Sequence, residues 1–203
     1  LCAAIYDNFA RNKIMPGQQE HYHQLKTLLG KMESFFHGSS SGTDPLISYL
    51  NQTVLLNGSD IRTLNWQLPG AESSWRFFLL DTGIQRQAGI FIEYFLNKTR
   101  DSHFQQILNE TLLPANEQAI KYTLDQAFEA LLPVFHEVSA FQLNHLPGLL
   151  PPGFEELWKK GLSSDLFKLK ICGAGGGGFI LGFTRDFEQT SNVLKEFSLL
   201  VPN

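Results

Sequence analysis

The chain has 203 residues, 43% of them hydrophobic and 18% charged, which is typical of a globular protein with a sizeable core. Its formal net charge of -4 argues against a broad nucleic-acid surface, because such a surface needs clustered lysine and arginine. No apolar run approaches the roughly 18 residues of a membrane-spanning helix, so no membrane partner is expected. Two cysteines, Cys2 and Cys172, are too few for a disulfide framework and indicate a reducing cytoplasm.

The first part of the chain is predicted to form helices joined by loops. Residues 1–12 form the first helix. Residues 18–36 form the second, in which apolar side chains recur at steps of three and four. A loop rich in glycine and serine follows. Thr43 or Asp44 is expected to cap a short helix with Pro45 at its first position.

The start of the chain has its own pattern. Leu1 is not Met, and no capping residue precedes the first predicted helix. The segment also lacks the pattern of a signal peptide. We therefore expect the chain to be the later part of a longer protein.

The rest of the chain alternates between strands and helices. Strands are predicted at residues 53–56, 61–66 and 75–80. Helical patterns follow at residues 85–97, 102–112, 116–130, 134–146 and 153–161. The chain closes with strand 167–171, a glycine loop, strand 179–184 and helix 186–197. In strand 167–171, Lys168 and Lys170 alternate with apolar residues and are expected to point outward. This order predicts an α+β fold with a mainly antiparallel sheet packed by helices. The linker at residues 69–74 is the predicted boundary between domains 1–70 and 71–203.

The sharpest motif is the glycine run at residues 173–178, with five glycines in six residues. Each glycine loses extra backbone entropy on folding, so such a run is costly unless the backbone must approach another group closely. The run favours an anion site built from successive amides, with a flexible hairpin loop as the alternative. It also matches G-x-G-x-x-G, but that motif must open a helix, and here a strand follows. A dinucleotide site is therefore not predicted.

A second glycine pattern, at residues 38–42, matches the G-x-S-x-G nucleophile elbow. That elbow needs a strand before its serine and a helix after it. A long amphipathic helix precedes this one, so a serine hydrolase is a poor interpretation.

Glu33, His37 and Asp44 flank this loop. In a phosphoryl-transfer site, one carboxylate can hold Mg²⁺ while another orients or deprotonates the attacking hydroxyl. In the alternative interpretation, Asp44 is a helix N-cap and Glu33 a solvated side chain. His37 and Gly38 could equally form a helix C-cap pair.

Three stretches resemble the GHMP kinases (galactokinase, homoserine kinase, mevalonate kinase and phosphomevalonate kinase). Glu33 followed by residues 37–44 resembles the E…HG-x-PSG-x-D signature of mevalonate kinases. Residues 78–83 resemble the strand and turn that open the family's C-terminal domain. Residues 170–178 resemble its third motif, K-x-x-GAGGGG. The stretches occur in the family's order, and the first helix looks like the one that follows the family's ATP-phosphate loop.

The resemblance implies a GHMP kinase fold, with residues 1–70 as the later part of the N-terminal domain and residues 71–203 as the C-terminal domain. It implies ATP and Mg²⁺ as cofactors, and γ-phosphate transfer to a hydroxyl of a small acid, with mevalonate first. Asp44 would be the catalytic aspartate and Glu33 a Mg²⁺ ligand. The phosphate- and substrate-binding residues would be His37, Gly38, Ser41, Thr82, Gly173, Ala174, Gly175, Gly176, Gly177 and Gly178. The fragment alone would be inactive without the ATP loop, and a homodimer is compatible with the resemblance.

Two departures from the family pattern flank the acceptor pocket. Ser40 stands where the PSG stretch has its proline. The residues after Thr82 lack the lysine and the paired hydroxyls common in mevalonate kinases. A sugar or sugar-phosphate kinase therefore stays open as an alternative, and so does a binding relative that has lost catalysis.

Overall fold

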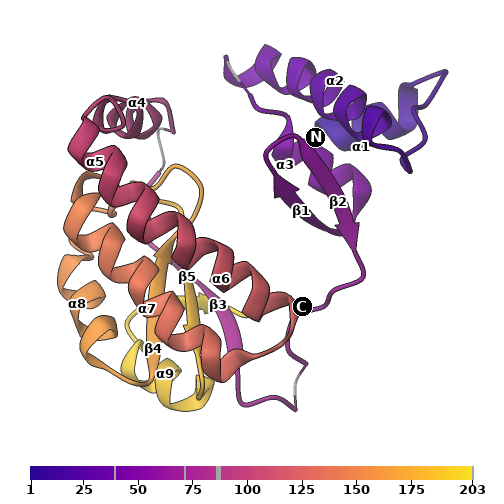
Figure 1. The fold of residues 1–203 in the computed structure, drawn as a ribbon. Coiled ribbons are helices and arrows are strands. Elements are labelled where there is room, and N and C mark those ends of the chain that lie inside the picture. Colours follow the sequence, from indigo (N-terminus) through magenta and orange to yellow (C-terminus); the bar gives the residue numbers. More distant parts are fainter. Residues whose placement is uncertain (39, 71, 86–87, 203) are drawn as a thin grey trace. The chain divides into compact units, whose positions relative to one another are not determined.

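The computed structural model describes residues 1–38, 40–70, 72–85 and 88–202 (Figure 1). The chain divides into two units, Leu1–Gln67 (unit 1) and Leu68–Asn203 (unit 2). Helices pack against antiparallel sheets in both units, so the predicted α+β class is confirmed. The assignment of residues 1–70 and 71–203 to the two domains of the kinase family stays a prediction.

Unit 1 packs helices against a β-hairpin. Its elements are α1 (Cys2–Phe9), α2 (Gln19–His37), α3 (Thr43–Leu50), β1 (Thr53–Asn57) and β2 (Asp60–Leu64). The two strands pair antiparallel. The apolar stripe of α2 supplies much of a small core, which consists of Tyr6, Leu25, Leu29, Leu46 and Ile61. The long helix predicted at residues 18–36 and both strands of the hairpin are confirmed.

The Gln19 side chain links the start of α2 to the hairpin. The Gln19 side chain donates to the Ile61 carbonyl over 2.7 Å, and its Oε1 accepts from the Ile61 amide over 3.0 Å. The side-chain amide thus bonds to the backbone of β2 much as a neighbouring strand would. This pairing holds the first turn of α2 against the hairpin.

Unit 2 is built on a four-stranded sheet. Its strands are β3 (Arg76–Asp81), β4 (Phe167–Ile171), β5 (Phe179–Thr184) and β6 (Ser198–Leu200). They lie in the order β4-β5-β3-β6, and every pairing is antiparallel. The glycine run connects the adjacent strands β4 and β5. The first and last residues of this run therefore lie close together at one end of the β4–β5 pair.

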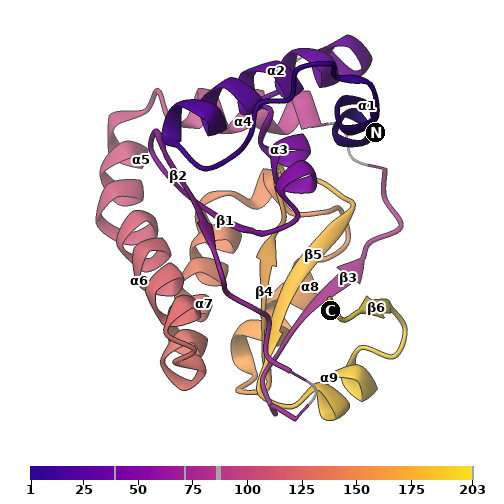
Figure 2. The ribbon, with the colours of Figure 1, turned by 90° about the vertical axis from the view of Figure 1, so that its right-hand side faces the viewer.

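Helices cover this sheet (Figures 1 and 2). They are α4 (Ala88–Lys98), α5 (Ser102–Ile107), α6 (Leu113–Leu124), α7 (Phe128–His145), α8 (Glu155–Ser163) and α9 (Phe187–Val193), with a π-helical turn, η1 (Leu108–Leu112), and a 3₁₀ turn, η2 (Pro147–Leu149). Helix α7 packs against β4 and β5, and α8 packs against β4. The core between them includes Phe78, Phe141, Trp158, Phe167 and Leu169.

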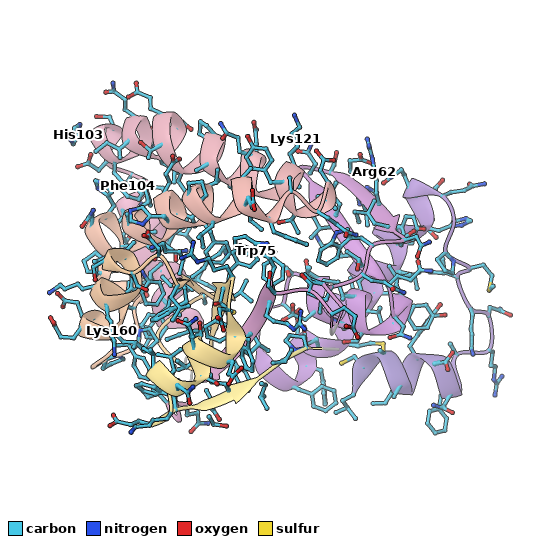
Figure 3. All side chains as sticks on the ribbon, turned by 90° about the horizontal axis from the view of Figure 1, so that it is seen from below. Arg62, Trp75, His103, Phe104, Lys121 and Lys160 are labelled. Atoms are coloured by element: carbon cyan, nitrogen blue, oxygen red, sulfur yellow. The ribbon has the colours of Figure 1, made fainter. Side chains whose placement is uncertain are left out.

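Aromatic side chains form a second cluster where the sheet meets the start of α7. Trp75, labelled in Figure 3, is one of them. It stacks on Phe183 with ring centroids 5.3 Å apart and planes inclined by 11°. Phe77 lies 4.7 Å from the same ring, and Phe128 and Phe135 of α7 lie within about 6 Å of it. Offset and tilted ring pairs of this kind add stability beyond the area they bury.

Two predicted boundaries in unit 2 were wrong. The predicted break near Pro133 does not occur. Pro133 lies in the second turn of α7, where it removes one backbone donor while the helix continues. The chain instead breaks between α6 and α7, where Gln126 has a φ of 54°. At the C-terminus the predicted helix 186–197 is shorter, because α9 ends at Val193 and a turn at residues 194–197 leads into β6, which pairs with β3.

Candidate functional site

In unit 1 the predicted metal ligand is tied to the loop that follows it. Glu33 is half-buried near the end of α2, and its Oε2 accepts a hydrogen bond from the Ser40 hydroxyl. The same hydroxyl oxygen accepts from the Gly42 amide over 3.0 Å. Ser40 therefore fixes both the Glu33 carboxylate and the loop backbone in one arrangement.

The loop is also pressed against α2 at two glycines. Gly42 has a φ of 73°, and a Cβ there would overlap the carbonyl oxygen of Lys26. A Cβ on Gly30 would lie 3.1 Å from Gly42 Cα. Two backbones can approach this closely only without side chains, which explains a glycine at each position.

Asp44 lies in the first turn of α3 with its side chain exposed. The predicted cap was wrong, because Gly42 is the N-cap and neither Thr43 nor Asp44 makes a side-chain cap bond. The Ser41 hydroxyl instead accepts from the Thr43 amide over 3.3 Å. Asp44 is thus left as an ionisable, solvent-accessible carboxylate at the positive end of a helix dipole.

The other predicted residues of unit 1 lie along the same loop. Gly38 is the C-cap of α2, and its amide donates to the Ser34 carbonyl over 2.9 Å, as in the alternative C-cap interpretation. Ser41 is exposed. The His37 side chain lies outside the described part of the structure, as does residue 39.

In unit 2 the glycine run has a defined conformation. Gly173, Gly175, Gly176 and Gly178 have φ values of 57°, 82°, 74° and 69°. A Cβ on Gly176 would overlap the Phe91 ring of α4. These contacts place the run against its own unit, so the alternative of a flexible hairpin loop is not needed to explain its glycines.

Three amides of the run bond to carbonyls of the same unit. The Gly176 amide donates to the Leu149 carbonyl over 2.7 Å, and the Gly178 amide donates to the Ile84 carbonyl over 2.8 Å. The Gly175 amide reaches the Cys172 carbonyl over 3.3 Å. A cradle of successive amides would need these donors, so a phosphate group would have to rely on the remaining amides of the run.

Thr82 closes the other side of the run. Its amide and its hydroxyl both donate to the Gly178 carbonyl, over 3.0 and 2.7 Å. The hydroxyl oxygen also accepts from the Ile84 amide over 3.2 Å. The predicted site residues Thr82 and Gly178 are therefore in direct contact, although they lie 96 positions apart in the sequence.

The alternation in β4 predicted that Lys168 and Lys170 point into solvent. This prediction was wrong for both lysines. Lys168 is 4% exposed, because α7 and α8 cover this face of the strand. Its ammonium donates to the carbonyls of Gly161, Leu162 and Ser164 at the end of α8. Burial lowers the pKa of Lys168 below its ordinary 10.5, and Asp165 opposes this shift. Lys168 therefore closes the negative end of a helix.

Lys170, the first residue of the motif, is half-buried. Its ammonium donates to the Ile171 carbonyl over 3.1 Å. Burial lowers its pKa as well, opposed by Cys172. Sequence reasoning missed this position, because a two-residue alternation alone cannot reveal a helix packed on the second face of a strand.

The described residues fit a Mg²⁺ ion that is bound jointly by the protein and a substrate phosphate, and they do not form a metal site made of protein ligands alone. Among the described residues, no three His, Cys, Asp or Glu side chains gather to hold a metal ion. Mg²⁺ keeps several waters and is commonly bound through one or two carboxylates together with substrate phosphates. The half-buried Glu33 carboxylate fits that role.

Hollows occur in both units. In unit 1 a groove of about 860 Å³ lies between the end of α3 and the hairpin, lined by residues such as Asn51, Gln52, Asn65 and Trp66. It contains none of the predicted site residues. In unit 2 a cavity of about 410 Å³ is lined in part by Gly173 and Ala174. Over the described residues, no helix combines the length and apolarity needed to cross a membrane.

Comparison with known families decides what kind of domain unit 2 contains. Residues 118–202 match the family model described as GHMP kinases C terminal. Residues 118–202 are thus similar to the C-terminal domain of the GHMP kinases. The match includes the Lys170 motif and the glycine run, so the predicted resemblance of these residues to the GHMP kinases is confirmed. No curated protein matches the chain.

Solved structures extend the likeness over both units. Mevalonate kinase from Methanococcus jannaschii has a TM-score of 0.62 at 14% identity, over 98% of this chain and 59% of that one. Mevalonate kinase from methicillin-resistant Staphylococcus aureus MRSA252 has a TM-score of 0.53 at 21% identity, over 100% and 65%. Lactococcus lactis galactokinase, solved with galactose, has a TM-score of 0.61 at 12% identity, over 98% and 62%. The chain has the GHMP kinase fold and spans less than two thirds of each of these proteins.

Proposed function

We propose that the protein containing this chain is an ATP-dependent kinase that transfers the γ-phosphate to a hydroxyl of a small acid, with mevalonate as the first candidate. The observation that carries the proposal is the glycine run of the third motif, packed in a defined conformation within a GHMP kinase C-terminal domain. The proposed setting is a reducing cytoplasm.

The proposed roles follow from the chemistry of the side chains. Asp44 would accept the proton of the attacking hydroxyl, since its carboxylate is exposed in the first turn of α3. Glu33 would hold Mg²⁺, which supplies neutralisation of the phosphate charge when bound. His37, Gly38 and Ser41 would line the same loop on the substrate side.

In unit 2 the glycine run and Thr82 would contact the phosphate or the acceptor. The amides that already donate to Leu149 and Ile84 would fix the run, which leaves the backbone of Gly173, Ala174 and Gly177 to face a ligand. Such pre-positioned groups lower the cost of reaching the transition state, because they need no rearrangement during the reaction.

A sugar acceptor is the second candidate. The galactokinase likeness has a TM-score of 0.61, close to the 0.62 of the Methanococcus jannaschii mevalonate kinase, and Ser40 departs from the mevalonate kinase signature. A binding relative without catalysis is the remaining alternative.

The test is a substrate panel on the complete protein that contains this chain, with ADP release as the readout. Mevalonate, homoserine, galactose and galactose 1-phosphate would be compared, each with ATP and Mg²⁺. We expect ADP release that depends on mevalonate. Turnover of galactose without mevalonate turnover would identify a sugar kinase, and no turnover with ATP binding retained would identify a non-catalytic relative.

A further inference from the structure

The cavity of unit 2 has the size and lining of a small-molecule site. Its volume of about 410 Å³ lies within the range of roughly 300–1,000 Å³ that ligand pockets occupy. Phe91 and Phe95 of α4 line it, together with Leu146 and Leu149 beyond the end of α7. Every residue that lines it belongs to unit 2.

One charged side chain lies among these apolar walls. Among the described residues, Lys170 is the only Asp, Glu, Lys or Arg that lines the cavity, and none of their ion pairs involves it. Its ammonium has one hydrogen bond, to the Ile171 carbonyl. Removing a cation from water without an anionic partner is costly, so a ligand anion at this position would offset that cost.

A neutral donor stands beside the lysine. Gln142 of α7 is 8% exposed, and its Oε1 accepts from the Ile171 amide over 2.9 Å. This bond fixes the side-chain amide, whose nitrogen has no hydrogen bond to other described residues. Lys170 and Gln142 thus offer N–H donors, and no Asp or Glu is among the described residues that line the cavity. Such an arrangement favours an anionic ligand.

The backbone around the cavity is also unusual. Leu112 lines it from the π-helical turn η1, and π-helical turns occur frequently at functional sites. The beginning of the glycine run, Gly173 and Ala174, also lines the cavity. Phe91 lines the cavity and also packs on Gly176, so an occupant would contact a side chain that holds the run in place.

We propose that this cavity binds an amphipathic anion, a ligand with an apolar body and one terminal carboxylate or phosphate that pairs with Lys170. The apolar body lies against Phe91, Phe95 and Leu149, and the Gln142 amide donates to the anionic group. The cavity shares Gly173 and Ala174 with the proposed kinase site. The inference does not rest on kinase activity, because it concerns binding of an anion to residues of unit 2 alone.

The first test is calorimetric titration of the 203-residue protein with octanoate, octyl phosphate, 1-octanol and octylammonium. We expect at least one of the two anions to bind about tenfold more tightly than 1-octanol, as a charge-assisted hydrogen bond would give, and octylammonium to bind least. The tighter of the two anions identifies the head group. Equal affinity for the anions and 1-octanol, or no binding of any probe, would overturn the proposal.

Substitutions then locate the anion. Lys170→Met should remove the preference for the anion over 1-octanol while 1-octanol still binds. Lys160→Met is the matched control, because Lys160 is exposed on α8 (Figure 3) and should leave all affinities unchanged. An unchanged preference in Lys170→Met would place the anion elsewhere and contradict the proposal.

A second pair of variants does not depend on the buried lysine. Leu96 lines the cavity and is 54% exposed, so charged side chains are tolerated there. Leu96→Glu should weaken anion binding several-fold, whereas Leu96→Lys should retain or strengthen it. Since both variants place a charged side chain at position 96, a general folding defect would weaken binding in both. Equal anion affinity of the two would count against an anion in this cavity.

Discussion

The Ser40 hydroxyl donates a hydrogen bond to the Glu33 carboxylate, and its oxygen accepts a second one from the Gly42 amide. The residue that departs from the mevalonate kinase signature is thus the one that connects the predicted Mg²⁺ ligand to the loop. A proline at this position could not make either bond, because it has no side-chain hydroxyl. Ser40 therefore replaces the fixed backbone of a proline with side-chain hydrogen bonds that link Glu33 to the loop.

Ser40→Ala should lower the stability of unit 1 by about 1–3 kcal/mol, since two hydrogen bonds are lost and the Gly42 amide loses its acceptor. Chemical denaturation of the 203-residue protein measures this. Ser48→Ala is the control, because Ser48 is exposed on α3. Equal midpoints for Ser40→Ala and the control would show that the tether contributes nothing.

Gly176→Ala should destabilise unit 2 more than Gly178→Ala does. Both positions have positive φ, which costs an alanine about 1–2 kcal/mol, but only the Gly176 Cβ would overlap the Phe91 ring. We expect the overlap to add about 1–3 kcal/mol.

The double variant Gly176→Ala/Phe91→Ala separates the two causes. It should recover part of the loss attributed to the overlap, relative to the sum of the single variants. Equal costs for Gly176→Ala and Gly178→Ala would mean that Phe91 does not hold the run.

The buried Lys168 predicts a pH dependence of stability. Its pKa is lowered in the folded protein, so between that value and 10.5 the unfolded chain binds more protons. The free energy of unfolding should therefore rise with pH across this alkaline window, relative to a Lys168→Met variant. Denaturation of both proteins from pH 7 to 10 tests this, with Lys160→Met as the control. A stability difference that falls or stays constant with pH would contradict the burial of this ammonium.

Local patterns predicted most elements of the fold. The period of α2 and the alternation of β4 are properties of consecutive residues, and both elements appear where they were predicted, as does β5. Strand β6 was missed, because three residues carry too little periodicity and only pairing with β3 makes them a strand. Pro133 was misread, because its effect depends on its position within α7.

The sequence predicted which residues form the candidate site but did not predict which residues they contact. The sequence identified the glycine run as a close backbone approach, and Phe91, Leu149 and Ile84 are the groups it approaches. These partners lie far away along the chain, so no local pattern could name them. For the same reason the solvent-facing assignment of Lys168 failed, since its partners at the end of α8 come from tertiary packing.

The most direct test of the account is the effect of Asp44→Asn on the complete protein, with kcat measured by ADP release and ATP affinity by calorimetry. Asp125→Asn, an exposed aspartate at the end of α6, is the matched control. We predict that Asp44→Asn lowers kcat by roughly 10²–10⁴-fold and leaves ATP affinity nearly unchanged, because the carboxylate acts on the acceptor hydroxyl. If Asp44→Asn retained the kcat of the control, or lost ATP affinity and turnover equally, Asp44 would not be the catalytic carboxylate.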